Sequence, residues 1–474
     1  MNFFKFTFFL LLTTFFNDLF AQNAEMDLRN CIEFAFKNNL QVQQSELNIS
    51  QSKLSNKQAK WAIAPNANAS FRHGANFGRS IDFTSYQYVN QATHSSQFSL
   101  NFGQPVYMGM QMRNRILQSS IDMQASEMDA QQVKDNVALS VAQAYLSILL
   151  AEEQILVLKE QLKVTEAQYQ QTLKFITAGR LPENTRFDLE AQIARNEQAV
   201  VNAENGLEFA YLNLKVLMNM NPSEKLNIKK VDFNLPADNQ EFIFDDIYNS
   251  ASNTLPGITA ARIREQSAKM GVKIAKGGLL PTISAYGSLF TNFSSASKET
   301  TFQSVTQTFN VNVLGVQVPL DFPTTVPVQG NTIPYFKQIW DNIYSNVGVN
   351  MSVPIFNGLQ TRIAIDRANL AVKIAELNSQ TVQNQLKSDI QRAINDVRAA
   401  QKSYVVAEKS LKATKASVEN TKKRFELGVV NGFEMVSAQN MLISAESTLI
   451  QTKFDFIFKT KVLDFYRGNR LISE

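Results

Sequence analysis

Apolar residues recur alternately three and four positions apart along two long segments of the chain. In the first segment they run from Val141 to Ile176, and in the second each position lies 249 residues later, as Ile390 does after Val141. This spacing is typical of coiled-coil helices, which bury one narrow stripe against a neighbouring helix. The pattern predicts long helices over residues 109–178 and 358–427, each about 100 Å long at 1.5 Å per residue.

These two segments belong to a longer internal repeat. Residues 105–179 and 354–428 align without a gap at the constant offset of 249 residues that separates Pro105 from Pro354. Other matched pairs are Gly109 and Gly358, Arg113 and Arg362, Lys163 and Lys412, and Gly179 and Gly428. Nearer the N-terminus of each half the offset is 216 residues, the separation of Ala35 from its counterpart in the second half. The sequence therefore predicts one structure built from two similar halves.

The repeat divides the chain into a series of expected domains. We expect a first structural repeat over residues 22–220, a connector over 221–243, and a second structural repeat over 244–474. Each repeat should contain an opening helix, a β-hairpin, a long helix, a glycine turn and a shorter returning helix. The expected ranges are 26–64 and 244–280 for the opening helices, and 182–219 and 434–467 for the returning helices.

Between the opening and the long helix of each half, the hydrophobic period changes from helical to twofold. The alternation predicts β-hairpins over about 66–107 and 282–356, the second with an inserted segment over 294–343. Strands of about ten residues with one apolar face are typical of transmembrane β-barrels, although a strand of a soluble sandwich has the same pattern. The positions expected to face lipid are Phe71, Phe77, Phe98, Leu100, Phe102, Ile283, Leu289, Val347, Val349 and Met351.

Four strands are too few to close a barrel by themselves. Single-chain membrane barrels begin at about eight strands, and an open sheet edge is not tolerated in lipid. Several copies of the chain must then contribute strands. Three copies would supply twelve and leave a lumen, while two copies remain an alternative on this argument alone.

The first 21 residues have the features of a secretory signal peptide. Lys5 precedes an apolar run from Phe6 to Phe16, and Ala21 stands at the expected cleavage site. A membrane anchor is the alternative, but the run is shorter than the ~20 residues that cross a bilayer. We expect no other stretch of the chain to form an apolar membrane helix.

Composition and charge exclude several classes of function. A net charge of +4 over 474 residues provides no basic surface for nucleic acid. One cysteine, Cys31, permits no internal disulfide, and with His73 and His94 as the only histidines a closed zinc site is not expected. The sequence contains no nucleophile elbow, phosphate-binding loop or metal-ligand cluster. We therefore expect a protein that is not an enzyme and that binds no cofactor or metal.

Several segments resemble the TolC-like outer-membrane efflux protein family, also called outer membrane factors. The segments are Leu280-Pro281, the run from Val353 to Gly358, and the run from Leu427 to Val430 followed by Glu434 and Ala438. The resemblance covers about residues 26–468 and is carried by the order of elements, which occurs twice.

The resemblance implies an α+β membrane protein in which a long antiparallel α-helical coiled-coil barrel is continued by a transmembrane β-barrel, with four strands per protomer of a homotrimer. It implies a location in the outer membrane of a Gram-negative bacterium, extending into the periplasm. The implied function is the passive exit duct of a tripartite efflux system for small toxic compounds. Its partners would be outer-membrane lipid, a periplasmic adaptor (membrane fusion protein) and an inner-membrane RND or ABC pump.

By the same resemblance, the glycine turns over 178–182 and 427–433 would be periplasmic tips. The implied adaptor-docking residues are Gly179, Arg180, Leu181, Gly428, Val429 and Val430. The implied periplasmic gate contains Phe425, Glu434, Ser437 and Asp188. Val430 and Ser437 depart from the family pattern, which has a basic residue and a carboxylate there. Glu434 either contributes to an acidic ring that attracts cations or simply favours the start of a helix.

Two other functions fit parts of this pattern. The same duct would serve a type I protein secretion system, since the difference lies in the partners. An envelope-anchored structural coiled-coil protein is an alternative of another class, but such a protein needs no two-faced hairpin in each half.

Overall fold

The computed structural model describes residues 25–81, 88–90, 92–230, 242–313 and 316–469. The expected signal peptide, residues 1–21, and residues 231–241 of the expected connector lie outside these ranges. The chain forms two compact units. The helical unit contains the described residues up to Leu54 together with Ser120–Ala268 and those from Ala371 onward, and the sheet unit contains Ser55–Ser119 and Lys269–Leu370. Each unit takes segments from both halves of the sequence.

The two long helices are confirmed, and their bounds repeat at the sequence offset. Helices α4 (Gln111–Thr177) and α9 (Gln360–Glu426) each contain 67 residues. Each begins two residues after a glycine with positive φ, Gly109 at 59° and Gly358 at 62°, and the intervening Met110 and Leu359 also have positive φ. Glycine adopts this left-handed conformation without the steric cost that other residues incur, so both helices start at an equivalent turn.

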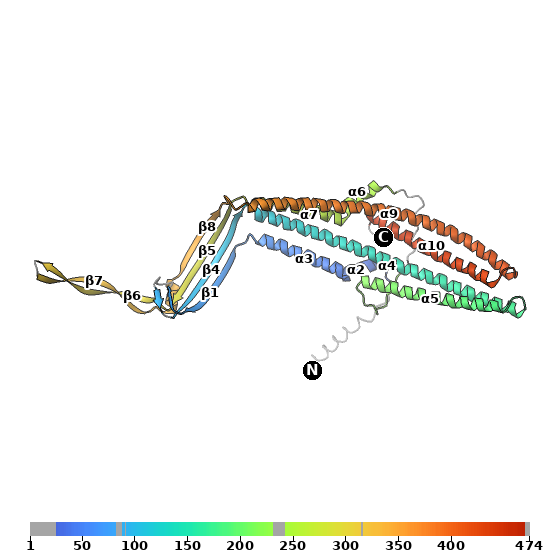
Figure 1. Cartoon of the computed structure of the whole chain (residues 1–474), viewed down its shortest axis with the longest axis horizontal. Coiled ribbons are helices and arrows are strands. Elements are labelled where there is room, and N and C mark those ends of the chain that lie inside the picture. Colours follow the sequence, from blue (N-terminus) through green and yellow to red (C-terminus); the bar gives the residue numbers. More distant parts are fainter. Residues whose placement is uncertain (1–24, 82–87, 91, 231–241, 314–315, 470–474) are drawn as a thin grey trace, which may run out of the picture. The chain divides into compact units, whose positions relative to one another are not determined.

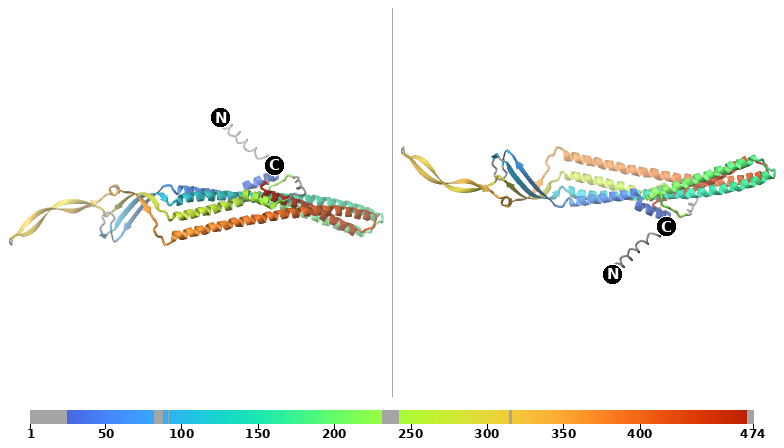
Figure 2. Two further views of the ribbon diagram at one scale, coloured as in Figure 1. Left: turned by 90° about the horizontal axis from the view of Figure 1, so that it is seen from above. Right: turned by 90° about the horizontal axis from the view of Figure 1, so that it is seen from below.

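The shorter helices return along the long ones. Helix α5 (Asn184–Leu217) follows α4, and α10 (Gly432–Tyr466) follows α9. Figures 1 and 2 show each pair as an antiparallel hairpin. The expected ranges of the returning helices agree with these bounds to within two residues.

Each opening helix is broken in two, and the expectation of a single helix was wrong. The first half has α2 (Leu28–Asn38) and α3 (Leu40–Trp61), and the second has α6 (Phe244–Thr254) and α7 (Pro256–Gly277). The breaks have local causes. Asn39 is extended, and its side chain accepts hydrogen bonds from the N–H groups of Gln41 and Val42, which caps α3. Leu255 is extended because the ring of Pro256 disfavours helical geometry in the preceding residue.

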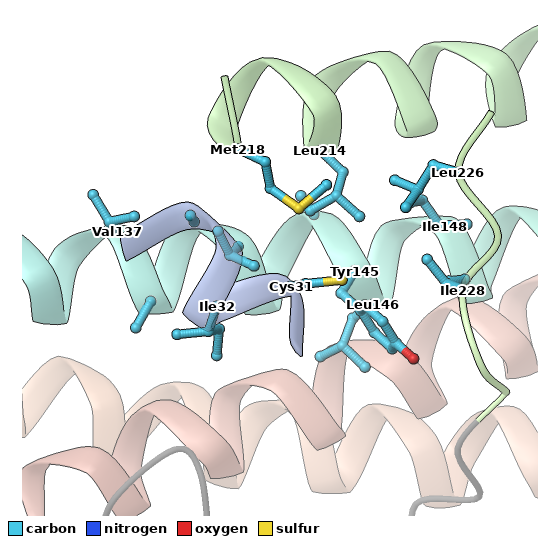
Figure 3. Packing of buried hydrophobic residues seen from close by; sticks show 14 of the residues in the cluster. Cys31, Ile32, Val137, Tyr145, Leu146, Ile148, Leu214, Met218, Leu226 and Ile228 are labelled. Atoms are coloured by element: carbon cyan, nitrogen blue, oxygen red, sulfur yellow. The ribbon is translucent and has the colours of Figure 1, made fainter. Parts of the chain in front are cut away.

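The helical unit has two apolar cores with equivalent membership. In the first, Cys31 and Ile32 of α2 pack against Tyr145 and Ile148 of α4 and Leu214 of α5 (Figure 3). In the second, the corresponding elements α6, α9 and α10 contribute Ile247, Ala251, Ile390, Val397, Phe456 and Leu463. Predicted periodic positions such as Val141, Ile148, Ile390 and Val397 are among those buried here, beside others outside the period such as Tyr145 and Ile394.

Helix α4 bears on the expectation that no other stretch forms an apolar membrane helix. By length and composition alone it is the one helix, within the described residues, that could cross a membrane. The apolar window responsible is 44% buried inside the protein. Its apolar side chains include Val141, Tyr145 and Ile148, which pack against α2 and α5. The apolar stretch is thus accounted for by the first core.

The buried thiol of Cys31 leads to a testable prediction. Burial, reinforced by the charge of Asp27, raises its pKa from 9.0 to about 12. Because the folded state favours the neutral thiol, this contribution to stability is complete below pH 9 and is lost as the pH rises towards 12. We expect native protein to react with maleimide about a thousandfold more slowly than unfolded protein, in line with the scarcity of thiolate. Labelling at equal rates with and without denaturant would contradict this assignment.

The sheet unit contains a four-stranded antiparallel sheet with the order β1-β4-β5-β8. Its strands are β1 (Asn66–Asn76), β4 (Thr93–Met108), β5 (Thr282–Ser294) and β8 (Tyr344–Ser352) (Figure 1). The pairing of β4 with β5 joins the two sequence halves in one sheet. Short strands β2 (Arg79–Ile81) and β3 (Tyr88–Asn90) pair separately. Among the described strands, β1 and β8 form the edges of the four-stranded sheet.

The inserted segment of the second half forms a ribbon and a short helix. Strands β6 (Lys298–Val313) and β7 (Val316–Thr332) pair as a separate two-stranded sheet, and α8 (Tyr335–Asp341) precedes β8. Gln338 of α8 is 2% exposed and joins both ends of the ribbon. Its amide donates to the carbonyl oxygens of Ser294 and Ile333 at 3.0 and 2.8 Å, and accepts from the N–H of Ser294 at 3.0 Å.

Candidate functional site: the helical tips and the apolar face of the sheet

The first tip is a glycine turn that closes the C-terminus of α4. Gly179 has φ +71°, and its N–H donates to the carbonyl of Ile176 at 2.9 Å. The N–H of Arg180 donates to the carbonyl of Phe175, also at 2.9 Å. These are the two hydrogen bonds of a Schellman motif, which satisfies carbonyls that a helix end leaves without partners. The Arg180 guanidinium lies 5.0 Å from the centre of the Phe175 ring.

The second tip repeats this geometry at the C-terminus of α9. Gly428 has φ +75°, its N–H donates to Phe425, and the N–H of Val429 donates to Arg424, both at 2.9 Å. The sequence that follows differs. Asn431 caps α10 by accepting from the N–H of Glu434 at 2.9 Å, whereas α5 starts without a side-chain cap.

The glycine turns permit a comparison between two otherwise similar substitutions. A Cβ added to Gly179 or to Gly206 in the middle of α5 would meet no atom within 4 Å, but only Gly179 has positive φ. Gly179→Ala should cost about 1–2 kcal/mol and Gly206→Ala should gain about 0.5–1 kcal/mol. We expect amide exchange in the last turn of α4 to become roughly five- to thirtyfold faster in Gly179→Ala. Slower exchange in both variants would show that the turn does not require a left-handed residue.

The predicted tip residues differ in exposure. Leu427 and Val429 are 75% and 64% exposed, whereas Val430 is 5% exposed. Gly179, Arg180 and Gly428 are exposed, and Leu181 is half-buried. The Val430 side chain is therefore not available to a partner in this conformation.

Phe425, assigned to the gate by resemblance, lies inside the protein. It is 4% exposed and packs with Val430, Met435 and Leu181 in a small apolar cluster. This cluster contains residues from both tips, and Gly432 brings the start of α10 close to α5. A Cβ on Gly432 would lie 2.9 Å from the Thr185 side chain. Phe425 thus packs the two tips of one chain together.

The other gate candidates lie on the helices that leave the tips. Glu434 and Asp188 are exposed, and Ser437 is half-buried. Asp188 and Ser437 line one groove of about 660 Å³ between α5 and α10, together with Arg195 and Phe433. The structure therefore brings Asp188 and Ser437 together, with Glu434 on the first turn of the same helix as Ser437.

A buried polar network joins the two tip hairpins, and the sequence reasoning missed it. The Gln192 amide of α5 donates to the Asn440 side chain of α10 at 2.9 Å, and the Gln439 side chain of α10 donates to Gln168 of α4. Gln192 and Gln439 are each 2% exposed. We call Gln168, Gln192, Gln439 and Asn440 the polar ladder.

Asn196 of α5 and Thr165 of α4 extend the polar ladder. Gln192 also donates to Asn196, which donates to Thr165 at 3.0 Å. Three buried side-chain atoms of this region have no hydrogen-bond partner: Gln161 Nε2, Thr172 Oγ1 and Gln439 Oε1. The contacts between the helices near the tips are thus largely polar, unlike those of the two apolar cores. The sequence offered one sign of this polar region, because Thr165 and Thr172 stand at positions of the apolar period.

The register of the sheet places most of the predicted lipid-facing residues on one face. Directly paired residues share a face, and the pairs on this face are Phe71 with Phe98, Ala69 with Leu100, Ala67 with Phe102, Leu100 with Leu289, Phe102 with Gly287, Gly287 with Val347, Ala285 with Val349, and Ile283 with Met351. Val347, Val349 and Met351 are 87%, 71% and 60% exposed. The opposite face has Asn68, Ser70, Asn101, Ser288, Asn346 and Asn350. Phe77 is a correction, because it lies one residue beyond the end of β1.

One end of this apolar face is partly covered by α8. Trp340 is 72% exposed and lines, with Leu100, Leu289 and Ile343, an apolar groove of about 540 Å³. The other tryptophan, Trp61, ends α3 shortly before β1 and is 67% exposed. Within the described residues, no group of three or more His, Cys, Asp or Glu side chains is placed to hold a metal ion.

Known proteins share this arrangement. The structure of CusC matches with a TM-score of 0.74 at 14% identity, covering 94% of this chain and 93% of that one. The Campylobacter jejuni CmeC outer membrane channel matches with a TM-score of 0.71 at 16% identity, covering 96% and 87%. The outer membrane protein TolC of Vibrio cholerae is 21% identical over 379 residues, which cover 79% of this chain and 76% of the relative.

Paired coiled-coil helices together with an antiparallel sheet define a TolC-like α+β protein of the outer membrane, extending into the periplasm. The sequence profile described as "outer membrane efflux protein" matches residues 31–220 and 337–455. The chain belongs to this outer membrane efflux protein family, whose members are channels and not enzymes. Its function is accordingly that of an exit duct for efflux.

Proposed function

We propose that three copies of the chain form the outer-membrane duct of a tripartite efflux system. The observation that carries this proposal is a four-stranded sheet with one apolar face and two unpaired edges, β1 and β8. In lipid these edges require partners. Pairing of β8 with β1 of the next copy would close a barrel of twelve strands, with the apolar face towards lipid and the polar face towards the lumen. The two structural repeats, 22–220 and 244–474, would each supply half of a protomer's wall.

The helical tips would face the inner-membrane components. The exposed residues Arg180, Leu427 and Val429 are accessible to a periplasmic adaptor, which would connect the duct to an RND or ABC pump. Small toxic compounds are the proposed cargo, in keeping with the relatives described as efflux proteins, among them BepC of Brucella suis, 23% identical over 216 residues. The duct itself is passive.

The polar ladder would make the tip the part of the duct that opens. Opening requires the α9–α10 hairpin to separate from the α4–α5 hairpin. The two apolar cores resist such separation more than the small Phe425 cluster at the tips, because exposed apolar surface costs about 25 cal/mol per Å². Amides of the polar ladder exchange partners with water at a smaller net cost, about 0.5–1.5 kcal/mol per hydrogen bond.

The proposed function is tested by the mass and conductance of the full-length protein. Purified in detergent, it should have the mass of three chains, and in planar bilayers it should form discrete pores. A monomer that forms no pores would contradict the proposal. Crosslinking at the tips in cells should recover an adaptor together with its pump.

Glu434 is expected to influence ion flow through the closed tip. Three exposed carboxylates around a narrow opening attract cations and favour block by divalent ions. Glu434→Gln should weaken that block severalfold, measured as single-channel conductance at increasing concentrations of a divalent cation. Glu197→Gln, an exposed charge further along α5, is the control and should leave block unchanged. Unchanged block in Glu434→Gln would contradict a role in ion flow. The carboxylate would then act only by stabilising the N-terminus of α10.

A further inference from the structure

The β6–β7 ribbon has two chemically different faces. The register, in which Phe309 pairs with Leu320 and Thr308 with Asp321, assigns each residue to one of them. The apolar face contains Val305, Phe309, Val311, Val318, Leu320, Phe322, Val326 and Val328, with Thr301, Gln303, Gln307 and Thr324 between them. The polar face contains Ser304, Thr306, Thr308, Asn310, Asp321 and Thr325, with Pro319, Pro323 and Pro327. Phe302, at the base, is the one large apolar residue on the polar face.

The apolar face is exposed along its length. Val305, Val318 and Val328 are 38–39% exposed. Phe309 and Phe322 are 53% and 51% exposed, even though the centres of their rings lie only 6.1 Å apart. A two-stranded ribbon by itself is at best marginally stable in water. A largely apolar exposed face of this kind marks a surface that binds another molecule.

The free edge of β7 is unsuited to pairing with a further strand. Pairing runs without interruption from Thr300 to Val313, although Pro319, Pro323 and Pro327 have no N–H. These prolines therefore stand where β7 directs its backbone away from β6, on the free edge of the ribbon. At three positions this edge offers no donor to a further strand. The β7 edge is thus unsuited to pairing with a further strand. The apolar face is the larger surface that remains for a contact.

The charge and position of the ribbon indicate what covers that face. Asp321 is the only charged residue between positions 300 and 332, and it lies on the polar face. Apolar faces of identical ribbons can therefore meet without burying or opposing charges. Through Gln338 the base of the ribbon is fixed beside β5, and the chain continues from α8 directly into the edge strand β8. In the proposed trimer this edge adjoins the next copy, so the ribbons arise close to one another.

We propose that the apolar faces of the β6–β7 ribbons from neighbouring copies of this chain bind one another. This inference rests on the proposed trimer. The contact is between faces, with the prolines and Asp321 outward in water. It gives the inserted segment a function of its own, as a self-association element at the end of the sheet opposite the long helices.

Crosslinking of adjacent residues tests the inference. Val311→Cys places a thiol on the apolar face, and the matched control Asn310→Cys places one on the polar face, next to it in the chain. The native Cys31 is 0% exposed and serves as an unreactive background. Full-length protein in lipid vesicles is treated with a three-armed maleimide. We expect at least about fivefold more covalent trimer from Val311→Cys than from Asn310→Cys.

A second pair and a mass measurement separate the possible failures. Val318→Cys against Gln317→Cys repeats the comparison on β7 if one variant folds poorly. Monomeric mass before crosslinking would sink the proposed trimer. Trimeric mass with equal crosslinking on both faces, or with an apolar-face thiol freely labelled by a water-soluble maleimide, would overturn the ribbon contact alone. A different protein bound to this face would leave Val311→Cys both uncrosslinked and unlabelled, which also overturns it.

Discussion

Val349→Lys is expected to prevent stable insertion of the protein into a membrane. Val349 is 71% exposed on the apolar face of the edge strand β8, where a trimeric barrel would meet lipid. A lysine on the lipid face costs about 2–4 kcal/mol near the middle of the bilayer. Each trimer contains the substitution three times, so the loss is large beside the stability of a single domain, about 5–15 kcal/mol. The measurement is the fraction of protein that enters lipid vesicles and resists extraction by urea.

Asn350→Lys is the matched control. It adds the same charge to the next residue, whose side chain is on the polar face of the same strand. In the proposed barrel this face lines a lumen filled with water, and insertion should remain within about 1 kcal/mol of the parent protein. Equal insertion of the two variants would show that the apolar face of the sheet does not meet lipid, and a defect in Asn350→Lys alone would reverse the assignment of the faces.

Gln192→Ala should increase conductance through the tip. The change removes the side chain that joins α5 to Asn440 of α10 and leaves Asn196 and Arg195 without their bonds to it. Loss of a buried partner costs roughly 1–3 kcal/mol, which shifts an equilibrium between closed and open tips by about 5- to 150-fold. We therefore expect a marked rise in open probability, recorded from single channels in planar bilayers.

The control for this experiment lies on the same helix. Gln198 is exposed, and its amide donates only to Asn202 one turn away on α5. Gln198→Ala should leave the conductance unchanged. If Gln192→Ala behaves like Gln198→Ala, the polar ladder does not hold the tips together.

The parts of the fold that sequence predicted are those set by repeated local patterns. The bounds of α4 and α9 followed from the apolar period and from Gly109, Gly179, Gly358 and Gly428, because helix length depends mainly on where such signals lie. The faces of the strands followed from alternation for the same reason. The break before Pro256 also had a local signal, which the longer helical period obscured.

The remaining features depend on contacts between distant segments. Sequence spacing alone does not reveal that Phe425 and Val430 meet Leu181 from the other half, or that Gln192 meets Asn440 across 248 residues. For the same reason the sequence does not predict where the inserted segment 294–343 lies. The base of the ribbon is held by one buried side-chain amide, that of Gln338. Its partners are backbone carbonyl groups, which every residue provides.

The equal lengths of α4 and α9 have a consequence for symmetry. Each contains 67 residues between equivalent glycine turns, so in the proposed trimer the six long helices would follow a pseudo-sixfold arrangement. The two described halves differ at both ends of the long helices. Only the second half has the β6–β7 ribbon, and only the second tip has the Asn431 cap, so the symmetry of the arrangement is threefold. A ring of six identical partner subunits would then meet two kinds of tip in alternation. Such a ring must bind through features that both tips share or through two distinct modes.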